Sequence, residues 1–153
     1  MKLELEPIGV VRSSRAEALD DQWDAVQSRI ELDASRFTPE ALAGLDAFSH
    51  LVVVYSFHKT DPAKTESRAR HPRGNTAWPK VGIFAQRGKD RPNHLGVCTC
   101  GILKVHGLTV EVQGLDAIDG TPVLDLKPYM QGFEPRTSIR EPEWAREIMK
   151  AYW

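Results

Sequence analysis

Residues 84–96 read FAQRGKDRPNHLG and concentrate charge between two groups of apolar residues. The guanidinium of Arg87 presents paired donors in a planar fork, which suits recognition of a carboxylate; the alternative is an ordinary surface arginine. Pro92 fixes its own φ and favours extended geometry at Arg91, so Arg87 and Arg91 need not lie side by side. For Arg91 an alternative to ligand contact is to lock the loop by reaching backbone carbonyls. The stretch is therefore predicted to be a rigid turn between strands with a charged, ligand-binding tip.

Positive charge is also concentrated around this stretch. Residues 59–91 hold nine Lys or Arg against three Asp or Glu, although the formal net charge of the whole chain is only −1. Such a patch indicates a partner that carries phosphate, and the alternative is a solvated loop whose charges only keep the chain soluble. The side chains assigned to RNA contact are Lys64, Arg68, Arg70, Arg73, Lys89 and Arg91.

Common nucleotide-binding and hydrolytic motifs are absent. Gly82 and Gly88-Lys89 resemble a phosphate-binding loop, but five residues separate the glycines and Asp90 follows the lysine where Ser or Thr is needed. No G-x-G-x-x-G run and no G-x-S-x-G nucleophile elbow occurs.

A metal site is not predicted either. His50 and His58 lie eight residues apart without a third ligand nearby, and Cys98 and Cys100 lack a partnering Cys or His pair. Alternation along a strand places the two cysteines on one face, which predicts buried free thiols.

The elements that must position these residues are mainly strands. Apolar and β-branched runs separated by turn signals predict strands at 3–13, 48–57, 81–85, 97–105, 109–115 and 122–127. A long loop is predicted at 58–80, a short helix after Thr38-Pro39 and a packing helix within 141–153. The packing helix carries Ala145, Ile148, Met149 and Tyr152 at helical spacing, as expected for a core or dimer contact.

The fold class predicted from these elements is mostly β. We expect a single-sheeted antiparallel barrel-like domain spanning residues 1–153, with a few peripheral helices. No apolar run approaches the roughly 20 residues of a membrane-spanning helix, and the N-terminus alternates charge, so a cytoplasmic location is expected.

Five ordered stretches carry a family resemblance. They are IGVVRS (8–13), LDAFSHLVVVYSFHK (45–59), HPRGN (71–75), KVGIFAQRGKDRPNHLG (80–96) and GLDAIDGTPVLDLKPYM (114–130). Together they resemble the TsaA-like family, whose characterised members are the tRNA methyltransferase O enzymes. The resemblance implies a homodimeric, S-adenosylmethionine-dependent methyltransferase without a Rossmann fold. Its implied target is N6 of a threonylcarbamoyl-adenosine next to the tRNA anticodon.

The resemblance also implies a set of cofactor-binding positions. They are Gln22, His58, Lys59, Arg87, Val97, Leu115, Asp116, Ala117 and Ile118. Arg87 would pair with the cofactor carboxylate, and Asp116 with a hydroxyl or the ammonium, unless it only shapes the turn before Asp119-Gly120. Backbone groups of 115–118 would read the adenine edge, with Leu115 and Val97 as apolar walls.

The catalytic base stays open at this level, with His58, Asp20 and Asp21 as candidates and Asp24 nearby. Trp23 either stacks on the target base or belongs to the core.

The sequence departs from the family pattern in three places. His94 and Leu95 replace the usual Pro-Ile, and residues 20–24 stand where members have an Arg-Gln-Pro-Gly stretch, with Gln22 as a retained member. The C-terminal extension of larger bacterial members is also missing. Two alternatives therefore remain: another RNA or small molecule as methyl acceptor, or a non-catalytic barrel that binds cofactor or nucleic acid.

Overall fold

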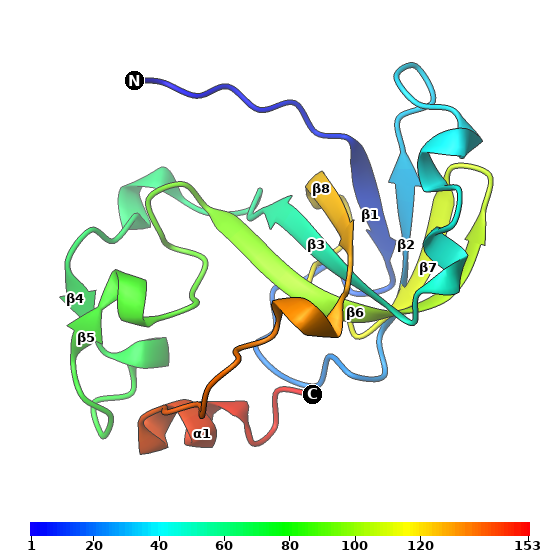
Figure 1. Cartoon of the computed structure of the whole chain (residues 1–153). Helices are drawn as coiled ribbons and strands as arrows, with labels where there is room; N and C mark the ends of the chain where they lie inside the picture. Colours follow the sequence, from blue (N-terminus) through cyan, green and yellow to red (C-terminus); the bar gives the residue numbers. More distant parts are fainter.

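A closed antiparallel barrel forms the centre of the computed structural model, which describes all residues 1–153 (Figure 1). Its strands are β1 (Gly9–Ser13), β2 (Gln27–Leu32), β3 (His50–Ser56), β6 (Leu95–His106), β7 (Thr109–Gln113) and β8 (Pro122–Pro128). Around the barrel they follow the order β1-β2-β7-β6-β3-β8, and β8 pairs with β1 to close the ring. The prediction of a mostly β, barrel-like domain is confirmed.

The barrel interior is filled by alternate residues of the strands. Leu51, Val53 and Tyr55 of β3 are buried, and Cys98 and Cys100 of β6 lie in the same core as free thiols. This confirms the prediction made from the spacing of the cysteines, because every second side chain of a strand faces the same side. Burial raises the pKa of the Cys98 thiol to about 11, so the thiol is neutral at pH 7.

Strand β6 belongs to both halves of the barrel. Residues Leu95 to Gly101 pair with β3, and Gly101 to His106 pair with β7. An irregularity between Ile102 and Lys104 shifts the register there. Such a shift bends a strand and increases its twist, which lets one long strand turn the corner of a closed barrel.

Two strand predictions need correction, and one strand was missed. Only residues 9–13 of the predicted 3–13 strand pair with a neighbour, and β2 was not predicted at all. The predicted strand at 81–85 is wrong: only β5 (Val81–Gly82) is extended, and Ile83–Ala85 forms a 3-10 turn. This turn buries Ile83 and leaves Phe84 exposed, so the apolar run is not a barrel strand.

The long loop predicted after β3 forms a compact excursion, here called the side lobe (residues 57–94), which lies to one side of the barrel (Figure 1). Within it β4 (Ala69–Arg70) pairs with β5. The buried side chain of Gln86 donates from Nε2 to the carbonyls of Arg70 (3.0 Å) and Val81 (2.9 Å). These bonds hold the lobe together where its strands are too short to do so.

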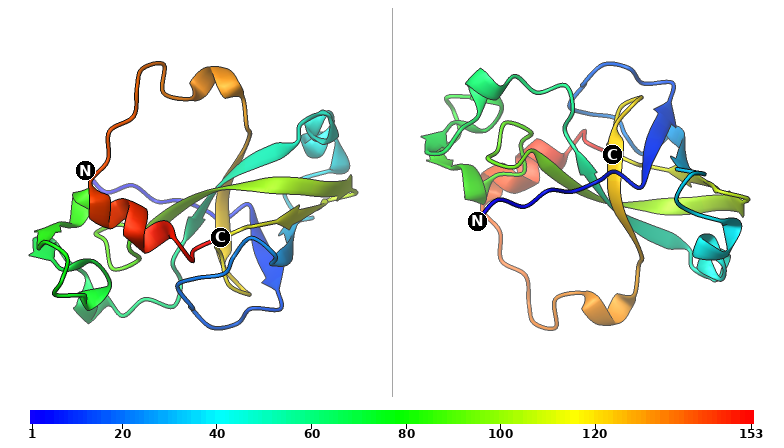
Figure 2. Two further views of the ribbon diagram at one scale, coloured as in Figure 1. Left: turned by 90° about the horizontal axis from the view of Figure 1, so that it is seen from below. Right: turned by 90° about the horizontal axis from the view of Figure 1, so that it is seen from above.

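The remaining helices are short. Thr38 precedes a 3-10 helix at Pro39–Leu42, and α1 spans Glu143–Met149, as predicted. The chain between β8 and α1 arches away from the barrel, and α1 then runs beside the side lobe (Figure 2). Trp78 of the lobe donates from Nε1 to Glu147 Oε2 of α1 at 2.6 Å. No helix is both long enough and apolar enough to cross a membrane.

Candidate functional site

Asp116 lies in the loop between β7 and β8, at one end of the barrel. Its neighbours Leu115 and Ala117 are buried in the core, which leaves the Asp116 side chain on the opposite side of the loop. The Asp116 amide contacts Cys98 Sγ at 3.4 Å, and its carbonyl accepts a hydrogen bond from the Tyr55 hydroxyl. The barrel core therefore fixes the backbone of this residue.

The Asp116 carboxyl has an unusual environment. Burial raises its pKa to about 6, and the hydrogen bond from Tyr152 and the charge of Arg87 act in the opposite direction. Asp20 raises the pKa further and Arg15 lowers it. A half-buried carboxyl surrounded by several ionisable groups is typical of a functional site as well as of a structural network, so the surrounding geometry must decide.

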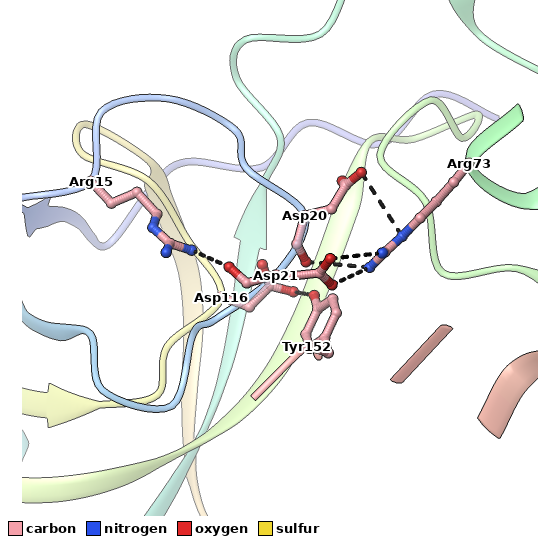
Figure 3. A network of polar contacts seen from close by, with 6 residues as sticks. All are labelled: Arg15, Asp20, Asp21, Arg73, Asp116 and Tyr152. Atoms are coloured by element: carbon pink, nitrogen blue, oxygen red, sulfur yellow. Dashed lines mark hydrogen bonds and ion pairs between the residues drawn. The ribbon is translucent and has the colours of Figure 1, made fainter. Parts of the chain in front are cut away.

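A network of polar contacts surrounds this carboxylate (Figure 3). The Tyr152 hydroxyl donates to Asp116 Oδ2. Arg73 of the side lobe donates to both carboxylate oxygens of Asp21, at 3.1 Å and 2.8 Å. Arg15 donates to the backbone carbonyl of Asp21 at 2.9 Å. These contacts join the β1–β2 loop, the side lobe and the C-terminus around one point.

Two residues of this network have left-handed backbone conformations that non-glycine residues rarely adopt: Gln22 has a φ of 64° and Arg73 a φ of 51°. The surrounding contacts hold the strained Gln22, because its amide donates to the Ala151 carbonyl at 3.0 Å and its carbonyl accepts from Arg15 at 3.0 Å. Backbone strain of this kind costs about 1–3 kcal/mol and is concentrated at functional sites.

Arg87 comes from the charged stretch that follows β5. One terminal nitrogen, Nη2, donates to the Val97 carbonyl at 2.8 Å, and the other guanidinium N–H groups have no protein partner. Arg87 also acts electrostatically on Asp116, so the two opposite charges share the same end of the barrel. Val97 is 47% exposed and offers an apolar surface next to this guanidinium.

His58 and Lys59 follow β3 at the same end of the barrel. A Cβ built on Gly120 would lie 3.6 Å from His58 Nε2, so the ring borders the turn after Asp119. Burial and then Lys59 lower the pKa of His58, and Asp119 opposes this shift. Lys59 Nζ donates to the Ala16 carbonyl at 3.0 Å, which ties it to the β1–β2 loop.

The role predicted for the Leu115 side chain is wrong, and the structure decides between the two alternatives for Trp23. Leu115 is fully buried in the barrel core, so its side chain is not an apolar wall for a ligand. Trp23 is only 2% exposed and carries the Arg15 guanidinium 4.1 Å from its ring centroid, so it has no face for a target base. The core alternative for Trp23 is the right one. Ala117 and Ile118 are also buried.

The acidic base candidates differ in their availability. Both carboxylate oxygens of Asp21 are engaged by Arg73, so Asp21 is not a free proton acceptor. The Asp20 side chain is 69% exposed, with a carboxylate oxygen 3.9 Å from Arg73 Nε. Asp24 is exposed and forms no side-chain hydrogen bond.

The residues assigned to RNA contact fall into two groups. Arg70 pairs with Asp90 at 2.9 Å, and Arg91 donates from Nη1 to the Gln86 carbonyl at 3.0 Å. The alternative that Arg91 locks the loop by reaching a backbone carbonyl is thus the right one. Together with Arg73, these two arginines are used within the protein. Lys64, Arg68 and Lys89 are exposed and have no carboxylate partner.

Three residues of the site were not predicted: Tyr55, Tyr152 and Arg15. Tyr55 appears in the sequence only as part of an apolar strand, and Tyr152 as part of the amphipathic helix stripe. In that stripe Ala145 and Ile148 are half-buried as expected, whereas Met149 is 40% exposed. Nothing local in the sequence indicates that the Tyr152 hydroxyl meets a residue 36 positions earlier.

A surface hollow of about 600 Å³ lies beside this network and not within it. It is an open polar hollow lined by residues that include Arg12, Ser13, Arg29, Glu111 and Asp119. We base the candidate site on the charged groups around Asp116, because the hollow is wide open and its two arginines already face Glu31.

Comparisons with known proteins agree with the resemblance noted above. Residues 18–134 match the family model described as the tRNA-methyltransferase O N-terminal domain. A tRNA (adenine(37)-N6)-methyltransferase of Escherichia coli is 36% identical over 137 residues, covering 83% of this chain and 57% of that protein. A probable S-adenosyl-L-methionine-binding protein of Methanothermobacter thermautotrophicus is 35% identical over 138 residues, covering 88% of this chain and 95% of that protein.

A solved structure supports the same relationship. The crystal structure of TrmO from Pseudomonas aeruginosa superposes with a TM-score of 0.73 at 28% identity, over 92% of this chain and 62% of that one. The human tRNA (adenine(37)-N6)-methyltransferase is 37% identical over 102 residues, covering 67% of this chain and 23% of that protein. The chain thus spans about a quarter of the human relative and a little over half of the bacterial one. It belongs to the family defined by the tRNA-methyltransferase O N-terminal domain.

Proposed function

We propose that this chain is an S-adenosylmethionine-dependent methyltransferase that methylates N6 of a threonylcarbamoyl-adenosine beside the tRNA anticodon. The observation that carries the proposal is that the partly unpartnered Arg87 guanidinium and the Asp116 carboxylate lie at the same end of the barrel, in a chain of this family. The names of the relatives, tRNA (adenine(37)-N6)-methyltransferase and S-adenosyl-L-methionine-binding protein, support the acceptor and the cofactor.

The residues present fit this cofactor chemically. S-adenosylmethionine carries a carboxylate, an ammonium, ribose hydroxyls and an adenine, and when bound it supplies a methyl group on a sulfonium. The unpartnered N–H groups of Arg87 suit the carboxylate, since a guanidinium binds carboxylates through parallel hydrogen bonds. Asp116 Oδ1, which has no protein partner, suits the ammonium or a hydroxyl, and Val97 provides apolar contact.

His58 is the proton acceptor that we propose for the N6 proton. Its lowered pKa keeps the imidazole neutral at pH 7, which is the form that can accept a proton. Asp21 is a weaker candidate, because Arg73 occupies both of its oxygens.

Lys64, Arg68 and Lys89 would contact the tRNA backbone, because among the residues assigned to RNA contact they are the exposed cations without an acidic partner. A tRNA substrate implies a cytoplasmic enzyme. A homodimer is proposed on the family resemblance, with tRNA bound across the side lobe.

The test is a methyl-transfer assay with labelled S-adenosylmethionine and total tRNA from a strain that lacks this activity. We expect label in an N6-methylated threonylcarbamoyl-adenosine, identified by mass after digestion. Arg87→Ala should weaken cofactor binding about tenfold or more, whereas the control Arg29→Ala, which pairs with Glu31 on the barrel surface, should not. If tRNA stays unlabelled and label appears in another RNA or a small molecule, the methyl acceptor is that molecule and not tRNA. If Arg87→Ala binds the cofactor as tightly as wild type, the proposed site is wrong.

A further inference from the structure

The C-terminal end of the chain folds back onto the β1–β2 loop. The Gln22 amide donates to the Ala151 carbonyl at 3.0 Å, and the Trp23 amide donates to the Tyr152 carbonyl at 2.9 Å. These two bonds place the Tyr152 side chain against Asp116, where its hydroxyl donates to Oδ2 (Figure 3). Tyr152 lies outside residues 18–134, the part of the chain that matches the family domain.

The Tyr152 ring is held from several sides. The Arg73 guanidinium lies 6.0 Å from the centroid of this ring, and Arg73 is itself anchored to Asp21. Further back along the C-terminal segment, Glu147 accepts the hydrogen bond from Trp78 of the side lobe. Contacts from the lobe and from the β1–β2 loop therefore fix where the Tyr152 hydroxyl points.

Asp116 is restrained at three points as a result. Its amide meets Cys98 Sγ, its carbonyl accepts from Tyr55, and its Oδ2 accepts from Tyr152. The remaining oxygen, Oδ1, has no partner in the protein. A carboxylate with one oxygen occupied and the other free is oriented for a single further donor, and a group preorganised in this way binds without having to lose rotamer freedom.

We propose that Tyr152 is a positioning residue of the cofactor site, which holds the Asp116 carboxylate so that Oδ1 is presented to the ammonium or a ribose hydroxyl of S-adenosylmethionine. This rests on the proposed function. The chain thereby completes its own site with a residue from beyond the family domain.

The ionisable neighbours of Asp116 set its pKa, so the positioning role of Tyr152 can be measured through the pH dependence of cofactor binding. It faces Tyr152 from the C-terminal segment, Arg87 from the charged loop, Arg15 and Asp20 from the β1–β2 loop, and Tyr55 and Cys98 from the barrel. The Tyr152 hydroxyl lowers the Asp116 pKa, which burial has raised to about 6. Removing the hydroxyl raises that pKa further, so less of the carboxylate is ionised between pH 6 and 7.

The experiment is calorimetric titration of the full chain with S-adenosylmethionine between pH 5.5 and 8.5, comparing wild type, Tyr152→Phe and Tyr129→Phe. Tyr152→Phe retains the ring and its packing. Tyr129→Phe is the matched control, because it removes another tyrosine-to-carboxylate bond, that to the exposed Glu134. We expect Tyr152→Phe to weaken binding about tenfold at pH 6.5, with less loss at pH 8.5 and an acidic midpoint shifted to higher pH.

Each outcome decides the proposal. An unchanged affinity and midpoint in Tyr152→Phe would show a merely structural tyrosine, and tighter binding would show that Tyr152 competes with the ligand; either overturns it. Equal losses in Tyr129→Phe would overturn it as well. In an Asp116→Asn background, the added effect of Tyr152→Phe should disappear. If wild type itself does not bind S-adenosylmethionine, both the proposed function and the role of Tyr152 are wrong. If wild type binds and Tyr152→Phe binds equally well, only the role of Tyr152 is wrong.

Discussion

At the scale of single residues, Asp116 is held in a state that is unfavourable for stability. An Asp in water has a pKa near 3.8, whereas burial raises that of Asp116 to about 6. The folded chain therefore pays a desolvation cost whenever the carboxylate is charged, and several neighbours only partly offset it. A buried charge kept at such a cost is consistent with a binding role and not with a role in stability.

This cost gives a signed prediction for Asp116→Asn. Because the pKa is raised in the folded state, the contribution of Asp116 to stability is fully present below about pH 3.8 and is lost as the pH rises through 6. The side chain of Asn has the same shape but does not ionise, so the variant keeps its stability as the pH rises. We expect Asp116→Asn to be about 2 kcal/mol more stable than wild type at pH 8, and equal or less stable at pH 4.

Urea unfolding of both proteins at pH 4 and pH 8 measures this difference. The same variant should lose cofactor affinity at pH 8. A variant that is less stable than wild type at both pH values would contradict the idea of an unfavourably buried charge.

Predictions about single residues were correct where the local sequence alone determines the position of the side chain. Strand alternation alone placed Cys98 and Cys100 in the core, and the backbone-carbonyl contact expected as one alternative for Arg91 is present. Leu115 was assigned a wrong role, and the role of Trp23 stayed open, because burial depends on which loop packs over the barrel end. That packing comes from tertiary contacts that no local pattern records.

At the scale of elements, the pairing of β3 and β6 shapes the site. Tyr55 reaches the Asp116 carbonyl across Gly96, which lies opposite Tyr55 in the register. A Cβ at Gly96 would lie 2.4 Å from Tyr55 Cε2 and 2.5 Å from Cζ, in a fully packed interior. The absence of a side chain at Gly96 therefore lets the ring lie flat against the strand and reach the loop.

We predict that Gly96→Ala destabilises the fold by about 2–3 kcal/mol, because the ring must move against close-packed neighbours. Gly101→Ala on the same strand is the matched control, since the nearest atom to its Cβ would be the Gln113 carbonyl oxygen at 3.8 Å. Urea unfolding midpoints of the two variants test this. Equal midpoints would mean that Tyr55 relaxes without cost.

Elements were predictable when their apolar runs were long. The runs at 48–57 and 97–105 gave β3 and β6, because β-branched and aromatic residues fit a buried pleated surface. β2, with the sequence QSRIEL, was missed, since three of its six side chains are charged or amide and face solvent. The VGIFA run failed for a different reason: the chain turns after Gly82, and only Ile83 is buried, within the side lobe.

At the scale of the whole molecule, the basic charge of residues 59–91 is partly neutralised by folding. Arg70 meets Asp90 within the side lobe, whereas Arg73 meets Asp21 and links the lobe to the β1–β2 loop. The cations left for a phosphate backbone are fewer than the composition suggests. The sequence predicted the location of the patch but not this division, because the pairing residues are distant in the chain.

The salt dependence of tRNA binding tests whether the unpaired cations of the side lobe contact the phosphate backbone. The quantity to measure is the slope of the logarithm of tRNA affinity against the logarithm of salt concentration. Replacing both Lys64 and Arg68 by Ala should make this slope less steep by about 1.5. Lys104 and Lys127, two exposed barrel lysines, form the control pair and should leave the slope unchanged. Equal slopes for wild type and the lobe variant would remove the side lobe from the RNA interface.

The central claim is that the cofactor lies where Arg87, Asp116 and Tyr152 meet at the end of the barrel. Crystals of the full chain soaked with S-adenosylhomocysteine test it most directly. The account predicts density with the amino-acid carboxylate on Arg87 and a ligand donor on Asp116 Oδ1, with Tyr152 still bonded to Oδ2. Density elsewhere, such as in the open hollow beside Arg12 and Asp119, with this point left empty, would contradict it.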